Sequence, residues 1–267
     1  MDIVEIFGYI GALFIGLVLG LIGGGGSILT VPILVYTLSF NPVIATAYSL
    51  FVVGTTSLVG ALQNMRKGKV DFKTAMIFSI PALSAVYLTR AYIIPAIPDK
   101  LFEVSNFVVT KNLFVMIFFA FIMLLASITM IRNTKQKPGK HIESKKNKYY
   151  LLIIQGFFIG LVTGLVGAGG GFLIIPALVL LAKLPMKKAV ASSLFIIAIN
   201  SLIGFLGDMQ IYDIDWSFLL IFTSISVVGI FIGTRLNNFV DGNRLKKAFG
   251  WFVLIMGVYI IYKELDD

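Results

Sequence analysis

Long apolar stretches alternate with short polar ones along the whole chain. Ten apolar segments are recognisable, at 3–22, 27–38, 43–62, 74–95, 107–131, 149–166, 171–182, 187–207, 216–234 and 247–262. Most approach the roughly 20 residues that a helix needs to cross about 30 Å of hydrocarbon. Segments 27–38 and 171–182 cover only about 18 Å as helix, and each follows a glycine cluster that interrupts a longer apolar run. The pattern predicts an all-α polytopic membrane protein.

The second half of the chain repeats the first half at an offset of 144 residues. Fourteen of the 22 positions from 14 to 35 are identical to those from 158 to 179, without a gap. The match continues from Ser49-Leu50-Phe51 to Ser193-Leu194-Phe195. Chance similarity between two glycine-rich membrane helices does not produce a register of this length. We predict an N-terminal repeat at 1–131, a basic cytoplasmic linker at 132–148 and a C-terminal repeat at 149–267.

The distribution of basic residues predicts how the two repeats are oriented. If each glycine-broken region is a hairpin, the loops on one side of the membrane hold 18 of the 22 lysines and arginines; if each is a single span, one side holds only 12. Cytoplasmic loops are enriched in basic residues. Loop 63–73 is basic, whereas its repeat partner 207–215 carries three aspartates and no base. We therefore expect two inverted repeats, each with a glycine-broken helical hairpin plus three full spans, and both termini outside.

The composition excludes several classes of function. Hydrophobic types make up 58% of the 267 residues and charged types 13%, unlike a soluble enzyme or a nucleic-acid-binding domain. The chain has no cysteine, which excludes disulfides and thiolate chemistry. The net charge of +9 comes from the short loops that set membrane orientation. We expect a lipid bilayer and a small solute as partners, and no nucleic acid, metal site, cofactor or catalytic residue.

The two glycine clusters are the first candidate binding site. Each precedes a short helix, whose unpaired N–H groups carry partial positive charge and favour an anion. Irregular backbone at membrane depth is tolerated where it lines a cavity or is buried in protein. A purely structural hairpin turn is the alternative, and the glycines spaced four apart at 16, 20, 24 and at 156, 160, 164 are expected to serve helix packing. The predicted substrate-binding residues are Gly25, Gly26, Ser27, Gly169, Gly170 and Gly171.

A polar stripe on the next helix of each repeat is the second candidate. Ser49 and Thr56 are two turns apart and share a face, and their repeat partners are Ser193 and Asn200. These groups can complete the hydrogen-bond shell of a bound anion or bond between helices. Asn200 is the strongest of the four, because an amide in mid-span is harder to satisfy locally.

Charged residues are expected to lie away from the pathway. Asp71 and Asp215 are expected to cap the following helices. Arg90, Lys111 and Lys183 fall near segment ends, where their side chains can reach the interface, and His141 falls in the basic linker. Neutral dipoles are therefore expected to bind the anion.

The duplicated motif G-x-x-x-G-x-x-G-x-G-G-x-x-x-x-x-P, at Gly16–Pro32 and Gly160–Pro176, resembles that of the TauE/SafE family of sulfite exporters. The resemblance covers essentially the whole chain. It implies a prokaryotic plasma-membrane permease, of about eight spans, that moves sulfite, organosulfonates or related sulfur-containing anions, usually outward.

The predicted function is thus a secondary transporter exporting a small sulfur-containing anion. A permease for a carboxylate or a neutral sulfur compound, and a non-transporting membrane subunit, are the alternatives. An intramembrane serine protease is disfavoured, because it needs an acid–base partner and the sole histidine lies in a loop.

Overall fold

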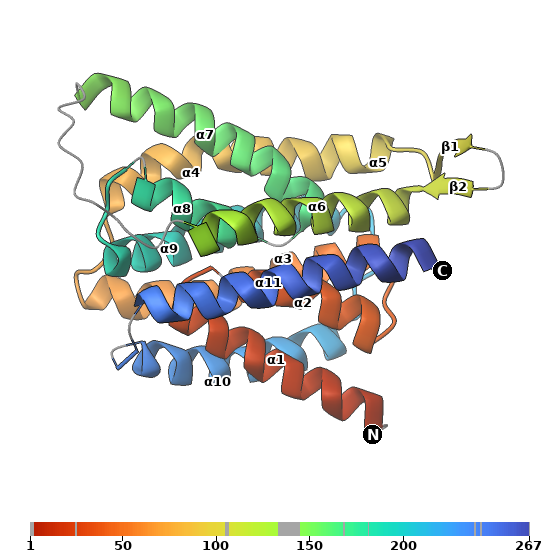
Figure 1. Cartoon of the computed structure of the whole chain (residues 1–267), viewed down its shortest axis with the longest axis horizontal. Helices are drawn as coiled ribbons and strands as arrows, with labels where there is room; N and C mark the ends of the chain where they lie inside the picture. Colours follow the sequence, from red (N-terminus) through yellow and green to blue (C-terminus); the bar gives the residue numbers. More distant parts are fainter. Residues whose placement is uncertain are drawn as a thin grey trace.

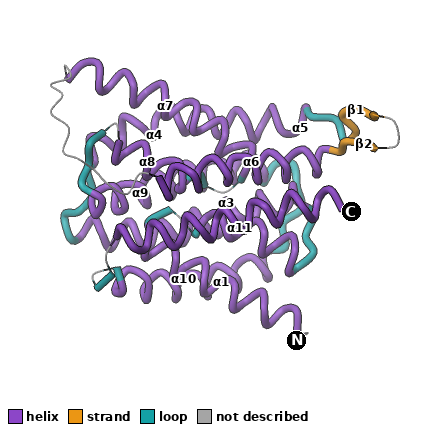
Figure 2. The backbone as a smooth tube through the Cα atoms, in the orientation of Figure 1, coloured by secondary structure: helices purple, strands orange, loops and turns teal. Residues whose placement is uncertain are grey.

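The computed structural model describes residues 3–24, 26–104, 107–132, 145–167, 169–180, 182–237, 239–240 and 242–266. It is a bundle of helices with one small β-hairpin (Figure 1, Figure 2). The predictions that concern Gly25, and His141 with most of the linker, lie outside the described residues.

The first half contains the following elements: α1 (Ile3–Ile22), α2 (Ser27–Pro32), the π-helix η1 (Ile33–Thr37), α3 (Pro42–Arg66), α4 (Phe72–Leu88), the π-helix η2 (Thr89–Ile93), α5 (Ile94–Ala96), β1 (Lys100–Val104), β2 (Phe107–Thr110) and α6 (Lys111–Arg132). The second half contains α7 (Lys145–Val166), α8 (Gly171–Leu180), α9 (Met186–Asp208), α10 (Trp216–Leu236) and α11 (Gly242–Asp266).

Residues 107–110 form a strand, so the prediction of a helix from residue 107 is wrong there. They pair antiparallel with β1. Phe107-Val108-Val109-Thr110 consists of aromatic and β-branched residues, which favour a pleated strand. The helix begins only at Lys111, where the Thr110 hydroxyl accepts a hydrogen bond from Leu113 N at 3.3 Å.

The outer surface of the bundle is apolar. Within the described residues, six helices are long and apolar enough to cross a membrane. Large apolar side chains are exposed on several of these helices and on their neighbours, among them Phe14, Phe158, Ile221, Val228 and Ile255. Such a perimeter suits hydrocarbon rather than water, which confirms the predicted polytopic membrane fold.

The repeat is visible in the backbone as well as in the sequence. Gly23 and Gly167, 144 residues apart, both have a positive φ, of 80° and 70°. Ser39 and Lys183, also 144 residues apart, have φ of 57° and 54°. Two such unusual backbone positions recurring in register show that the duplicated sequence folds locally in the same way twice.

The helix caps repeat in the same register. The Asp71 carboxylate accepts a hydrogen bond from Thr74 N at 3.0 Å, and the Asp215 carboxylate accepts one from Phe218 N at 3.1 Å. Both aspartates therefore act as N-caps of α4 and α10, as predicted.

The short segment formed by α2 and η1 folds back along α1. A Cβ added at Gly11 would lie 3.0 Å from Ile33, and one at Gly8 would lie 2.6 Å from Leu38. Later residues of the α2–η1 segment therefore lie beside earlier residues of α1, so the two run antiparallel. They form the predicted glycine-broken hairpin.

Helices of one half pack mainly against helices of the other half. The spaced glycines lie at these contacts: Gly16 and Gly20 of α1 meet the backbone of α10 near Ser226 and Thr234, so α1 and α10 run parallel. Gly156 and Gly160 of α7 meet Phe78 and Ala82 of α4 in the same way. The predicted packing role is confirmed for Gly16, Gly20, Gly156 and Gly160. It is wrong for Gly24, which lies beyond the end of α1 in the turn.

The helix α3 forms the centre of the bundle together with α9. Gly54 faces Leu202 and Gly60 faces Leu194, so α3 and α9 run antiparallel. The ends of the chain and the β-hairpin lie at one end of the bundle, and the loop between α3 and α4, which carries Lys67 and Lys69, lies at the other (Figure 1).

Candidate functional site

The two glycine clusters form tight turns that touch each other inside the bundle. Neither turn is continuous helix, since α1 ends at Ile22 and α7 ends at Val166. A Cβ added at Gly171 would lie 2.5 Å from the Cα of Gly24, and one at Gly24 would overlap the Gly171 carbonyl. Only glycine allows the two backbones to approach so closely.

In the first turn, residues 23–26, the carbonyl groups of Gly23, Gly24 and Gly26 all accept hydrogen bonds from the protein. The Ser27 hydroxyl donates to the Gly24 carbonyl at 2.7 Å. The Ser193 hydroxyl from α9 donates to the Gly23 carbonyl, also at 2.7 Å. A Cβ added at Gly26 would overlap the α1 backbone at Ile15. The polar groups beside this turn therefore hold the turn itself.

The polar stripe divides into bonded and unbonded members. Thr56 Oγ1 donates to Ser226 Oγ of α10 at 3.1 Å, which is interhelical bonding. Ser49 Oγ and Asn200 Oδ1 are buried and have no hydrogen-bond partner within the described structure. Buried polar atoms are normally paired. The Ser49 hydroxyl can therefore donate to an anion, whereas Asn200 Oδ1 is an acceptor and can pair only with a hydrogen-bond donor.

The second turn, residues 167–170, differs from the first in its surroundings. Gly167, Gly169 and Gly170 all have positive φ. A Cβ added at Gly169 would lie 2.7 Å from Ser201 Oγ, and one at Gly170 would overlap Thr163 Oγ1. Neither of these buried hydroxyls has a hydrogen-bond partner in the described part of the chain. Gly167 lies against Thr46 and Arg90.

Arg90 does not reach an interface, contrary to our prediction. Its side chain is 0% exposed, with Nη1 at 3.2 Å from Asp208 Oδ2 and 3.0 Å from Thr46 Oγ1. The helix α4 continues through η2 into α5, which places residue 90 inside the bundle. Asp208, expected in a loop, is the buried last residue of α9. The expected positions of Arg90 at an interface and of Asp208 in a loop are therefore both wrong.

Comparison of the repeats is the sequence signal that could have revealed this ion pair. The partners of Arg90 and Asp208, 144 residues away, are the neutral Thr234 and Asn64. Opposite charges introduced at two positions that are neutral in the other copy suggest mutual pairing.

The positions equivalent to this ion pair line a basic cavity at the opposite end of the bundle. Asn64, Thr234 and Val190, the repeat partners of Asp208, Arg90 and Thr46, lie there. The remaining lining residues are Gly20, Lys67, Lys69, Lys187 and Asn237. Three lysines around one opening create a positive potential that attracts anions.

A larger polar cavity, of about 530 Å³, opens near the ion pair. Its lining includes Val43, whose carbonyl accepts the Thr46 hydroxyl at 2.7 Å, and Tyr212. Burial raises the pKa of the Tyr212 hydroxyl; among nearby charges Asp208 raises the pKa further, Arg90 lowers it and Asp99 raises it. Tyr212 therefore keeps its proton at neutral pH and offers a hydrogen-bond donor between this cavity and the ion pair.

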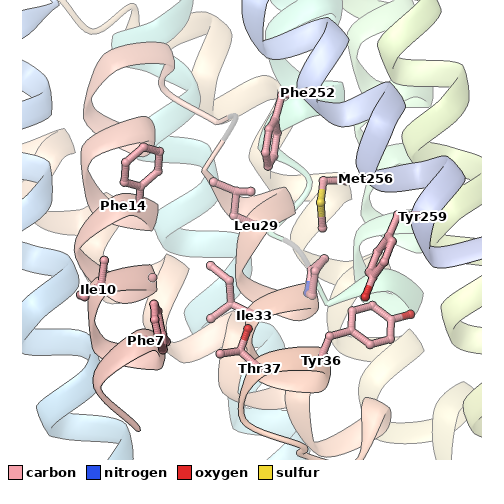
Figure 3. A pocket seen from close by; sticks show the side chains of 12 residues that line it. Phe7, Ile10, Phe14, Leu29, Ile33, Tyr36, Thr37, Phe252, Met256 and Tyr259 are labelled. Atoms are coloured by element: carbon pink, nitrogen blue, oxygen red, sulfur yellow. The ribbon is translucent and has the colours of Figure 1, made fainter. Parts of the chain in front are cut away.

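A third cavity, of about 450 Å³, is unsuited to an anion. It lies between α1, the α2–η1 segment and α11, and the side chains around it are mainly apolar (Figure 3). Phe7 and Phe14, on its rim, are about 60% exposed, as expected for a groove open to lipid. Within the described residues, no three His, Asp or Glu side chains come together in a way that could hold a metal ion.

Comparison with known sequences identifies the family. The sequence profile of the family described as "Sulfite exporter TauE/SafE" matches residues 9–260. The chain belongs to this family. A "Probable membrane transporter protein" of Xylella fastidiosa is 27% identical over 94% of this chain and 92% of its own length. The "Probable membrane transporter protein YunE" of Bacillus subtilis is 28% identical over 95% and 96%.

One relative matches only part of the chain. The "Probable membrane transporter protein MJ0441" of Methanocaldococcus jannaschii is 39% identical over 41% of this chain and 43% of its own length. No solved structure matches the chain. The family and the apolar helices together make this TauE/SafE-family chain a multi-pass membrane transporter of a prokaryote.

Proposed function

We propose that this TauE/SafE-family chain is a permease that exports sulfite, an organosulfonate or a related small sulfur-containing anion, and that it is not an enzyme. The observation that carries the proposal is the second glycine turn, beside which the hydroxyls of Thr163 and Ser201 are buried and have no hydrogen-bond partner among the described residues. A small basic recess of about 10 Å³ at one end of the bundle and a polar cavity of about 530 Å³ at the other mark the two ends of the proposed pathway. The family description supports the substrate class.

The proposal includes an inverted arrangement of the repeats. The parallel pairs α1–α10 and α4–α7, with the antiparallel pair α3–α9, support opposite directions for corresponding helices. Inverted repeats with interrupted helices are typical of secondary transporters, in which one repeat rocks against the other around a central site. Repeats 1–131 and 149–267, joined by the linker 132–148, are the units that move.

The proposed substrate-binding residues follow from the hydrogen-bond assignments. Gly169, Gly170 and Gly171 lie at the second turn and the start of α8, where their backbone N–H groups are the proposed contacts. The Ser49 hydroxyl has no hydrogen-bond partner among the described residues and can donate to the anion, and Asn200 is proposed to donate through its amide N–H group. Ser27, Thr56 and Ser193 bond to protein in this structure, so they contribute only in a conformation that releases them.

Flux measurements on the purified protein in liposomes test this function. Liposomes preloaded with sulfite or methanesulfonate should release it only when the protein is present, and acetate should leave more slowly. Preferential efflux of acetate would favour a carboxylate permease. Efflux of a neutral thioether, without efflux of any anion, would favour a permease for neutral solutes. Absence of any flux would favour a non-transporting subunit.

A further inference from the structure

The second glycine turn carries polar chemistry that the first turn lacks. Three residues beside it are Arg90, Thr46 and Thr163. Their repeat partners beside the first turn are Thr234, Val190 and Leu19. The backbone is duplicated, but at these three positions the second turn has an arginine and two threonines, whereas the first turn has one threonine and two apolar side chains.

Arg90 is only partly used by the protein. Its Nη1 contacts Asp208 and Thr46, but its Nε and Nη2 have no hydrogen-bond partner among the described residues, although the side chain is fully buried. A buried donor without an acceptor is destabilising, more so when the group is charged. Nη2 lies against the backbone of Gly167, where an added Cβ would overlap it, so the guanidinium edge faces the second turn.

We propose that Arg90 is the substrate-binding cation of the transporter, and that its Nε–Nη2 edge receives two oxygens of the transported oxyanion at the second glycine turn. This inference rests on the proposed function. A guanidinium presents two parallel N–H groups, which match two oxygens bound to one central atom, as in sulfite, a sulfonate or a carboxylate. The hydroxyls of Thr163 on α7 and Ser201 on α9 lie beside the same turn, next to Gly170 and Gly169, and can donate to the remaining oxygen because neither has a hydrogen-bond partner among the described residues.

Asp208 acts as the resident counter-ion of this site. Without substrate it neutralises Arg90 at 3.2 Å and makes the buried charge tolerable. When the substrate anion binds, both it and the Asp208 carboxylate interact with the Arg90 guanidinium. The carboxylate therefore competes with the substrate for Arg90. Competition keeps binding weak enough for release into the 530 Å³ cavity beyond Tyr212.

The chain itself supplies the variants that test this role. Asp208→Asn removes the competitor and leaves Arg90 without a carboxylate. The double variant Arg90→Thr/Asp208→Asn copies the neutral pair Thr234 and Asn64 that the other repeat uses at the equivalent positions, so no unpaired charge remains buried. Ser84→Ala, at an exposed position on α4, is the control for a substitution on the same helix.

Binding of sodium sulfite, methanesulfonate and acetate to the full-length protein in detergent, together with liposome flux, gives the readouts. We expect Asp208→Asn to bind sulfite at least about fivefold more tightly than wild type, and sulfite to raise its melting temperature more than that of wild type. The double variant should keep its fold, bind sulfite at least about tenfold more weakly and lose flux. Ser84→Ala should match wild type.

Three outcomes overturn the inference. If wild type neither binds nor moves any of the three anions, the proposed function fails and the inference fails with it. If wild type transports and the double variant does so equally well, only the role of Arg90 is refuted. If the double variant does not fold, unchanged or weaker sulfite binding by Asp208→Asn refutes that role, because a purely structural ion pair gives no gain in affinity.

Discussion

Gly24 of the first glycine turn lies directly against Gly171, which begins α8 immediately after the second turn, and the backbone of each occupies the place where a side chain of the other would be. The two residues belong to different repeats, so the halves of the chain meet backbone to backbone at the point where each hairpin reverses. A methyl group at either position has no space without separation of the turns. The contact therefore couples the geometry of one turn to that of the other.

Replacement of Gly24 or Gly171 by alanine should lower both stability and transport. Overpacking a close contact typically costs about 1–3 kcal/mol, so the melting temperature in detergent should fall by several degrees. Gly68→Asn is the control, since Gly68 also has a positive φ, of 62°, but has open space around its Cα, and asparagine tolerates this backbone. Wild-type flux from both alanine variants would show that the turns need not touch during transport.

Much of the scaffold could be predicted from the sequence because it is determined by short stretches of the chain. The glycine breaks and the caps at Asp71 and Asp215 depend on residues close together in the chain. The repeat is found by aligning the sequence with itself and needs no knowledge of contacts. Glycine clusters interrupt a helix wherever they occur, and an aspartate before an apolar run caps it whatever packs on it later.

The chemistry of the site could not be predicted in the same way, because it depends on contacts between distant residues. Position 90 is near the end of its apolar segment, and only the continuation of α4 through η2 places Arg90 inside the bundle opposite Asp208, which is 118 residues away in sequence. Likewise nothing in the sequence distinguishes Ser193, which bonds the first turn, from its partner Ser49, which bonds nothing in the described structure.

Ser49 and Ser193 should respond differently to alanine substitution. Ser193→Ala removes the bond to the Gly23 carbonyl and leaves a buried acceptor unpaired, which should cost about 1–3 kcal/mol of stability. Ser49→Ala removes an unbonded buried hydroxyl and should leave the melting temperature unchanged or slightly raised. Each variant is the matched control for the other, because the positions are repeat partners. Reduced sulfite flux in Ser49→Ala without loss of stability would support substrate contact; unchanged flux would exclude Ser49 from the pathway.

The orientation of the bundle can be measured with single cysteines, since the chain contains none. Lys69→Cys, in the basic loop after α3, should be protected from a membrane-impermeant maleimide in intact cells and react after permeabilisation. Asp213→Cys, at the repeat-related position after α9, should react in intact cells. Labelling of both variants from the same side would contradict the inverted arrangement. Reaction of Lys69→Cys but not of Asp213→Cys in intact cells would show that the protein has the opposite orientation in the membrane.

The membrane potential should drive export if the anion moves without a companion ion. The Arg90–Asp208 pair is neutral as a unit and belongs to the protein, so each monovalent anion released carries one charge outward. An interior potential of −100 mV favours that exit by about 2.3 kcal/mol, or about a 50-fold concentration ratio at equilibrium. Liposomes with a potassium diffusion potential and equal pH on both sides, which removes any contribution from ionisation of the substrate, should show faster sulfite efflux as the interior becomes more negative. Efflux that is independent of the imposed potential would mean that a proton or cation leaves with each anion, and that the transport cycle is electroneutral.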